Sequence, residues 1–167
     1  MGLSFDAHLY HPRIGELASL AGAFPDTRIV LNHIGTSLGI GAYRGKRNEV
    51  FASWAASIKA LAACQNVSIK IGGIGMRTTG FGFDEQAEPP SSETLASAFR
   101  PYFETCIEAF GTSRSMFESN FAVDKDTFYY AGFLNDCKLL AKGASNRAKA
   151  DLFAGTAARF YRVAAIE

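Results

Sequence analysis

Apolar segments with β-strand character alternate along the chain with segments in which apolar residues recur three or four positions apart. The strand-like segments are residues 3–12, 28–35, 67–75 and 115–123. The helical spacing predicts helices that begin near Ile14, Val50, Leu95, Phe133 and Ser145. The order βαβαβαβα is typical of an α/β fold with a parallel sheet, and the length fits a single domain over residues 1–167.

Pro101 lies inside the third helical segment, whose apolar pattern continues to Phe110. Proline lacks an amide hydrogen, and its ring clashes with the preceding turn of a helix. We therefore expect this helix to be kinked or split at Pro101.

Two of the predicted strands run into long glycine-rich loops. The second strand leads into "HIGTSLGIGAYRGKR" and the third into "GGIGMRTTGFGFDEQAEPP", and the two loops carry Arg44, Lys46, Arg47 and Arg77. Ligands of parallel α/β proteins bind beyond the carboxyl ends of the strands, and loops of this length are uncommon unless they have a function. We expect the functional site at this end of the sheet.

The composition excludes several classes of protein. Charged residues make up 20% of the chain, the net charge is +1, and the lysines and arginines are scattered, so we expect no nucleic-acid partner. No apolar run approaches the roughly 18 residues of a membrane helix, and no leader pattern is present, so we expect a cytoplasmic protein without a membrane partner. The three cysteines lack CxxC spacing and are expected to be buried free thiols.

Three histidines and a lysine are candidates for chemistry. His33 ends the second strand, where it could bind a metal, pass protons, or only fasten the loop by hydrogen bonds. His11 is expected to reach the same site, whereas His8, of opposite parity in the strand, is expected to pack under a helix or at an interface. Lys70 alternates with apolar residues in a strand expected to be buried on both faces, and a structural ion pair with Glu118 is favoured.

Two further groups stand near the strand ends. The segment "GGIG" at 72–75 lacks the spacing of a phosphate loop, so its glycines are expected to allow a sharp turn or the close approach of a ligand. Glu118, Ser119 and Asn120 are polar residues inside the fourth strand-like segment. Buried polar groups need partners, so this cluster has either a packing or a chemical reason.

Five motifs in this order resemble the C-terminal half of the amidohydrolase-related family, in its lactonase-like branch of metal-dependent hydrolases: "LYHP", "LNHIG", "VSIKIGG", "MFESNF" and "LFAGTAARFYRV". The resemblance implies an eight-stranded TIM barrel, of which the four strands would be strands five to eight. It also implies a site of strand-end His and Asp residues that often holds a divalent metal, most often zinc. Members of the family hydrolyse lactones or related C–O and C–N bonds.

The resemblance assigns roles to individual residues. His33 matches a strand-end histidine that binds metal or substrate, and Asn120 stands where many relatives have an aspartate that takes a proton from the attacking water. An amide orients water but is no general base at neutral pH, and the carboxylates of Glu118 and Asp124 lie nearby in the sequence. The family's strand-one HxH motif is absent, so we expect no tight zinc site within one chain.

The leading hypothesis is therefore a hydrolase of a small anionic lactone or cyclic ester or amide. The expected catalytic residues are His33, Glu118 and Asn120, and the expected substrate-binding residues are His11, Lys70, Arg44 and Arg77. The alternative is a catalytically inactive half-barrel that serves as an oligomeric or binding module. Half a barrel leaves open edges, so we expect a homo-oligomer or a missing N-terminal half.

Overall fold

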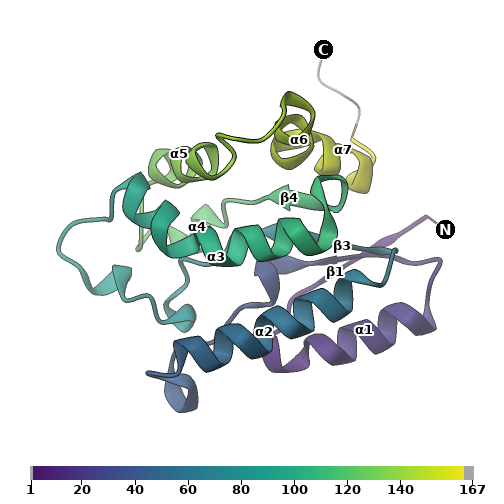
Figure 1. The fold of residues 1–167 in the computed structure, drawn as a ribbon, viewed down its shortest axis with the longest axis horizontal. Coiled ribbons are helices and arrows are strands. Elements are labelled where there is room, and N and C mark those ends of the chain that lie inside the picture. Colours follow the sequence, from purple (N-terminus) through teal and green to yellow (C-terminus); the bar gives the residue numbers. More distant parts are fainter. Residues whose placement is uncertain (1, 164–167) are drawn as a thin grey trace.

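The computed structural model describes residues 2–163, which form a four-stranded parallel sheet with helices packed along it (Figure 1). The strands lie in the order β1-β2-β3-β4, and every neighbouring pair is parallel. Their bounds are Ser4–Ala7 for β1, Arg28–Leu31 for β2, Val67–Ile71 for β3 and Ser115–Phe117 for β4. The predicted α/β class and parallel sheet are confirmed.

Helices are present at the five predicted places, and one further short helix begins inside the fourth strand-like segment. The α-helices are α1 Ile14–Ala23, α2 Arg47–Ala62, α3 Ser92–Phe110, α4 Phe121–Asp124, α5 Tyr130–Leu140, α6 Asn146–Ala150 and α7 Thr156–Tyr161. A π-helical turn, Asp151–Gly155, joins α6 to α7. Short 3-10 turns are His11–Arg13, Asn32–Gly35, Gly41–Tyr43, Arg77–Thr79, Phe83–Glu85 and Thr112–Arg114.

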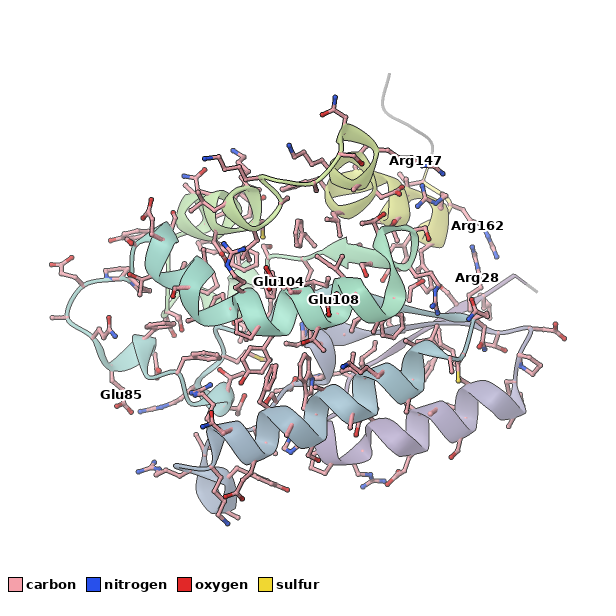
Figure 2. The ribbon with its side chains drawn as sticks, in the orientation of Figure 1. Arg28, Glu85, Glu104, Glu108, Arg147 and Arg162 are labelled. Carbon is pink, nitrogen blue, oxygen red and sulfur yellow. The ribbon has the colours of Figure 1, made fainter. Side chains whose placement is uncertain are left out.

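Helices α1, α2, α3 and α5 lie side by side as one layer, in which α2 contacts both α1 and α3 (Figure 1). The solvent side of α3 carries the exposed Glu104 and Glu108, whereas Arg147 projects from α6 (Figure 2). Helix α3 runs without a break through Pro101, so of the expected kink or split the split is wrong, and a kink stays a prediction. Its buried side, which includes Phe99 and Phe103, holds the helix in place despite the missing amide hydrogen.

The two faces of the sheet differ in character. Ile29, Leu31 and Ile69 belong to the main core under the helices, together with the fully buried Trp54 and Phe99. Residues of the opposite parity, Asp6, Val30, Lys70 and Met116, share the other face, which we call the Lys70 face. Phe160 of α7 packs there against Val30 and Met116. Lys70 is only half-buried, so the expectation that β3 is buried on both faces is wrong.

All four strands end earlier than the hydrophobic pattern indicates, and β2 and β3 end at Leu31 and Ile71 where the prediction continued them to residues 35 and 75. Strand β1 ends at Ala7 and the chain then turns through His11–Arg13, whereas the prediction continued the strand to residue 12. Strand β4 ends at Phe117, and Asn120 takes a left-handed conformation, with φ of 46°, that starts α4. Asparagine tolerates this conformation better than most residues, and it redirects the chain out of the sheet.

The three cysteines are free thiols that differ in burial. Cys106 and Cys137 are buried and Cys64 is half-buried, and all three thiols are free, as expected. Within residues 2–163, no helix is both long enough and apolar enough to cross a membrane.

Candidate functional site

His33 and Glu118 form a hydrogen-bonded pair at the carboxyl ends of β2 and β4. Oε1 of Glu118 lies 2.6 Å from Nδ1 of His33 and accepts a second hydrogen bond, 2.8 Å long, from the backbone N–H of His33. Both side chains are largely buried, with exposed fractions of 15% and 16%. Because the carboxylate accepts a hydrogen bond from Nδ1–H, the imidazole tautomer that leaves Nε2 unprotonated is favoured.

Two glycines at the end of β3 make this pair possible. A Cβ on Gly73 would lie 2.4 Å from Nδ1 of His33, and a Cβ on Gly72 would lie 2.0 Å from the carbonyl oxygen of Glu118. Since β3 lies between β2 and β4, any side chain at either position would push the imidazole and the carboxylate apart. The close approach expected of the "GGIG" segment is therefore made by the protein's own residues.

The backbone around His33 is strained. His33, Ile34 and Thr36 have positive φ angles of 54°, 49° and 25°, and Gly35 between them has 68°. A β-branched residue such as Ile34 rarely adopts this conformation, and each such residue costs on the order of 1–3 kcal/mol. The indole N–H of Trp54 donates a 2.7 Å hydrogen bond to the carbonyl oxygen of Ile34 and holds the turn. Strain of this kind is concentrated at functional sites.

His8, and not His11, contacts the ring of His33. His8 follows the last residue of β1, and its ring lies edge-on to that of His33 with 5.0 Å between centroids. His11 is buried in the 3-10 turn, where its Nδ1 accepts a hydrogen bond from the backbone N–H of Leu38. Burial lowers the pKa of His11, although its bond with Thr36 acts in the opposite direction. We expected His11 to reach the site of His33 and His8 to pack elsewhere, and this expectation is wrong. Strand β1 ends at Ala7, so the alternation of side chains along a strand does not extend to His11.

Lys70 pairs with Asp6 and not with Glu118. Its Nζ lies 2.9 Å from Oδ2 of Asp6, which also accepts a 2.5 Å hydrogen bond from the hydroxyl of Tyr161. Burial acts to lower the pKa of Lys70, but the bonds to Tyr161 and Asp6 and the charge of Glu118 outweigh it and raise that pKa. The favoured pair of Lys70 with Glu118 is corrected, because Glu118 turns to His33 and Lys70 reaches across β2 to Asp6.

Asn120 and Asp124 form a second polar pair beside the dyad. The side-chain amide of Asn120 donates a 3.0 Å hydrogen bond to Oδ1 of Asp124, a fully buried residue whose Oδ2 has no hydrogen-bond partner among residues 2–163. Burial raises the pKa of Asp124 to about 7, although the bond to Asn120 and the charge of His33 oppose this rise. Two residues of the polar cluster in the fourth strand-like segment thus belong to different pairs: Glu118 binds His33, and Asn120 binds Asp124.

The side chains of the described residues do not offer the ligand set that a zinc ion needs. Within residues 2–163, no three His, Cys, Asp or Glu side chains converge as metal ligands. Nδ1 of His33 is engaged by Glu118, which leaves only Nε2 of that residue, and structural or catalytic zinc sites need three or four protein ligands. The described residues alone therefore do not fit a zinc centre.

The loop arginines stand apart from the dyad. Arg44 and Arg77 are exposed and line a pocket between the two long loops, and neither His33 nor Glu118 lines that pocket. The structure brings His33, Glu118 and Asn120 to one end of the sheet, with Lys70 further down the Lys70 face. Whether these residues act on a substrate stays a prediction.

Sequence reasoning missed three residues around the site. Asp6 and His8 stand two positions apart at the end of β1, and this spacing puts both on the Lys70 face, so the pattern held a usable signal. Tyr161 lies 155 positions from Asp6 in the last helix, and no local pattern points to their contact.

The sequence of this chain is similar to those of known proteins. The family model described as "Amidohydrolase" matches residues 1–163. The uncharacterized protein y4mH of Sinorhizobium fredii is 38% identical over 162 residues, which are 97% of this chain and 48% of that protein. The chain thus spans about half the length of this curated relative.

Solved structures share the fold at lower identity. The crystal structure of an amidohydrolase from Burkholderia multivorans with bound zinc is 20% identical, with a TM-score of 0.81, and the match covers 96% of this chain and 53% of that one. A protein from Pseudomonas putida, provisionally named a 2-pyrone-4,6-dicarboxylic acid hydrolase, is 19% identical, with a TM-score of 0.61 and coverages of 96% and 52%. The described sheet and helices therefore correspond to about half of the TIM barrel of such structures.

Proposed function

Because the chain belongs to the amidohydrolase family, we propose that it takes part in hydrolysis of a small anionic lactone or cyclic ester or amide. The observation that carries the proposal is the pair of hydrogen bonds from His33 to Oε1 of Glu118, at 2.6 and 2.8 Å. An imidazole oriented by a buried carboxylate is a general base in many hydrolases.

The geometry supports a simple sequence of proton transfers. Within the described residues, Nε2 of His33 has no hydrogen-bond partner, so its lone pair is free to accept a proton from water. The resulting hydroxide attacks the carbonyl carbon, and a tetrahedral oxyanion forms. The imidazolium, stabilised by Glu118, then returns the proton from Nε2 to the leaving oxygen or nitrogen, and the ring opens. Glu118 keeps its charge throughout.

An anionic substrate is supported by the cations nearby. Lys70 stays protonated on the Lys70 face, and Arg44, which within residues 2–163 has no carboxylate at ion-pair distance, lies in a loop beyond the same strand ends. The relative from Pseudomonas putida is named for a lactone with two carboxylic acid groups. We therefore propose a carboxylate-bearing substrate, with Lys70 as one candidate for binding it. In such a role the ammonium group of Lys70 would contact the substrate carboxylate while it keeps its ion pair with Asp6.

A role for His33 as a metal ligand is a separate proposal. Nε2 of His33, with His8 beside it, would supply two nitrogen ligands, and further ligands would have to come from outside residues 2–163. A zinc ion in such a shared site would polarise the substrate carbonyl. The proton transfers assigned to His33 and Glu118 do not depend on it.

We further propose that the open edge of the sheet at β1 is covered by a second copy of this chain. Among the residues that the structure describes, strand β1 pairs on one side only, and Phe5 and Leu20, 46% and 39% exposed, lie in a groove of about 700 Å³ beside it. Uncovered edges with apolar side chains favour pairing with another chain.

The hydrolase proposal is tested by a panel of lactones, cyclic esters and cyclic amides, each with and without a carboxylate, followed by proton release. The expected result is turnover of a carboxylate-bearing member that falls about 100-fold or more in His33→Ala. The matched control is Lys59→Ala, an exposed position on α2 away from the site. Absence of turnover across the whole panel would overturn the proposal.

One observation favours a second function, a binding module without catalysis. Asn120 stands where the resemblance implies a proton-accepting aspartate, and its amide is occupied by a bond to Asp124. If the chain binds carboxylate ligands saturably and turns over none of the panel, this second function replaces the first.

A further inference from the structure

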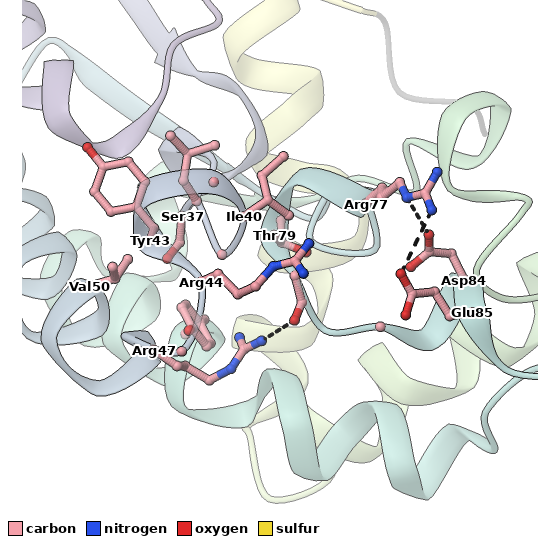
Figure 3. A pocket seen from close by; sticks show the side chains of 17 residues that line it. Ser37, Ile40, Tyr43, Arg44, Arg47, Val50, Arg77, Thr79, Asp84 and Glu85 are labelled. Atoms are coloured by element: carbon pink, nitrogen blue, oxygen red, sulfur yellow. Dashed lines mark hydrogen bonds and ion pairs between the residues drawn. The ribbon is translucent and has the colours of Figure 1, made fainter.

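A pocket of about 630 Å³ lies between the β2–α2 loop and the β3–α3 loop (Figure 3). Its wall is built from residues 37–50 and 77–85, together with Tyr102 of α3. None of the residues assigned to proton transfer lines it. It is therefore a separate cavity at the same end of the sheet as the dyad.

The pocket carries uncompensated positive charge. Three arginines and two carboxylates line it, but Arg77 pairs with both carboxylates, at 3.3 Å from Asp84 and 3.8 Å from Glu85 (Figure 3). Across residues 2–163, no carboxylate lies within ion-pair distance of Arg44 or Arg47. Two guanidinium groups thus face the cavity without an anionic partner.

Arg47 is already fixed in a binding orientation. Its Nη2 donates a 2.7 Å hydrogen bond to the carbonyl oxygen of Gly80, and its guanidinium lies 3.9 Å from the centre of the Phe81 ring. Phe81 in turn packs edge-on against Phe99 and Tyr102, at 5.1 and 5.9 Å. Because the neutral carbonyl leaves the positive charge in place, and the side chain is already ordered, an anion would bind with little further loss of entropy.

The two loops that form the wall are fastened to each other through their backbones. The N–H of Gly39 donates a 2.9 Å hydrogen bond to the carbonyl oxygen of Thr78. A Cβ on Gly39 would lie 2.2 Å from the carbonyl oxygen of Thr79, and one on Gly80 would lie 2.5 Å from that of Gly39. Only glycine permits contact this close. The cavity is therefore a built feature of the fold and not a gap between two loose loops.

The remaining lining indicates the kind of anion. Leu38, Ile40, Val50 and Tyr102 supply apolar surface beside the arginines. A planar guanidinium fork matches the two oxygens of a carboxylate, and apolar walls favour a hydrocarbon body. An inorganic anion would leave these walls in contact with water.

We infer that this pocket binds a small organic carboxylate, with Arg44 closing on the carboxylate and Arg47 as a fixed cationic wall. The binding does not require hydrolysis, so it stands or falls separately from the proposed activity. If the bound carboxylate is also the substrate, the pocket determines substrate class and the dyad performs the chemistry.

Calorimetric titration of the full chain with benzoate, benzamide and inorganic phosphate tests the inference. Saturable benzoate binding is expected, with weaker binding of benzamide, its neutral isostere, and of phosphate. Arg44→Gln and Arg47→Gln should each weaken benzoate binding about tenfold or more, since each removes a charge-assisted contact. The matched control is Arg147→Gln, which removes an exposed arginine from α6, far along the chain from both loops.

Three results would overturn the inference: no saturable benzoate binding, equal effects of Arg44→Gln and Arg147→Gln, or phosphate binding as tight as benzoate binding. His33→Ala should bind benzoate like the wild type. Benzoate binding without turnover of any lactone would uphold the pocket and refute the hydrolase, so the two failures are distinguishable.

Discussion

Oε1 of Glu118 lies 2.6 Å from Nδ1 of His33, although 85 positions separate the two residues in the sequence. The contact exists because β2, β3 and β4 are neighbours and because the strand between the two residues ends in glycines. The same carboxylate oxygen also binds the backbone N–H of His33.

Gly73→Ala should separate His33 from Glu118, because the added Cβ would lie 2.4 Å from Nδ1 and the position has a φ of 61°. The expected result is loss of the low-field Nδ1 proton resonance of His33 in NMR spectra, with turnover reduced at least tenfold. Gly22→Ala on α1 is the control, since a Cβ there meets nothing within 4 Å. An unchanged His33 resonance in Gly73→Ala would contradict the role given to this glycine.

Asp136→Asn should stabilise the protein at alkaline pH. Asp136 is fully buried on α5, and within the described part of the chain neither of its side-chain oxygens has a hydrogen-bond partner. Burial raises the pKa of Asp136 to about 7 against the opposing charge of Arg100. The folded state therefore holds a proton more tightly than the unfolded state, whose carboxyl has the ordinary pKa of 3.8. This contribution is fully present below the unfolded pKa and is lost as the pH rises from about 4 to about 7.

The wild type should accordingly lose on the order of 2–4 kcal/mol of stability from this group between acid and neutral pH, and Asp136→Asn should avoid that loss. Urea unfolding at pH 5 and pH 8 measures the difference. Glu104→Gln, at an exposed position on α3, serves as the control. A stability gain that is equal at both pH values would show that the buried charge is not its cause.

Lys70→Ala separates a structural role from a substrate-binding role. Loss of the Asp6 pair and of the contact with the Tyr161 ring, 5.4 Å from Nζ, should lower stability by about 1 kcal/mol in this half-exposed setting. If Lys70 also binds the substrate carboxylate, KM should rise at least tenfold. Tyr161→Phe keeps Lys70 and removes only the hydroxyl, so it should affect stability and leave KM unchanged. A rise in KM with Tyr161→Phe of the same size as that with Lys70→Ala would contradict direct substrate contact.

We expect this chain alone to bind zinc only weakly, because the possible ligand side chains of the described residues do not converge. After dialysis against micromolar zinc, elemental analysis should find well under one equivalent per chain, because no three ligands converge within residues 2–163. His33→Ala should change the measured content little. One tightly held zinc per chain that disappears in His33→Ala would show that His33 belongs to a site completed by groups beyond those described.

Leu20→Asp should produce monomers if β1 forms the contact between two copies. Light scattering on the wild type should give twice the mass of the chain, because Leu20 and Phe5 line an apolar groove at the open edge. Tyr129→Asp introduces the same charge at another exposed position, 69% exposed, and should leave the dimer intact. A monomeric wild type would refute self-association at this edge.

The helices and the order of strands could be predicted because apolar spacing reports which side of each element is buried. Ile14 and Leu17 of α1, like Val67 and Ile69 of β3, are buried as their spacing requires. The ends of the strands could not be predicted in this way. Asn120 leaves the sheet through a left-handed turn, and the apolar residues after it continue a pattern that the backbone no longer follows.

The candidate site was only partly readable from the sequence. The position of His33 and Glu118 near strand ends predicts that both belong to the site. Their pairing could not be predicted, because it depends on the register of three strands and on the space that Gly73 leaves for the imidazole. The predicted pair of Lys70 with Glu118 is wrong for the same reason. Glu118 follows the neighbouring strand β4, but the side chain of Lys70 passes over β2 and binds Asp6 on β1. Long-range side-chain choices of this kind follow from packing and not from local pattern.

A double-mutant cycle on His33 and Glu118 tests the central claim most directly. The rate of hydrolysis of the best panel substrate is measured for the wild type, Glu118→Gln, His33→Ala and the double variant. If Glu118 acts through the imidazole, Glu118→Gln lowers kcat about 100-fold in the wild-type background and has no further effect once His33 is alanine. The same fold reduction in both backgrounds would show that the two residues act independently and would contradict the account.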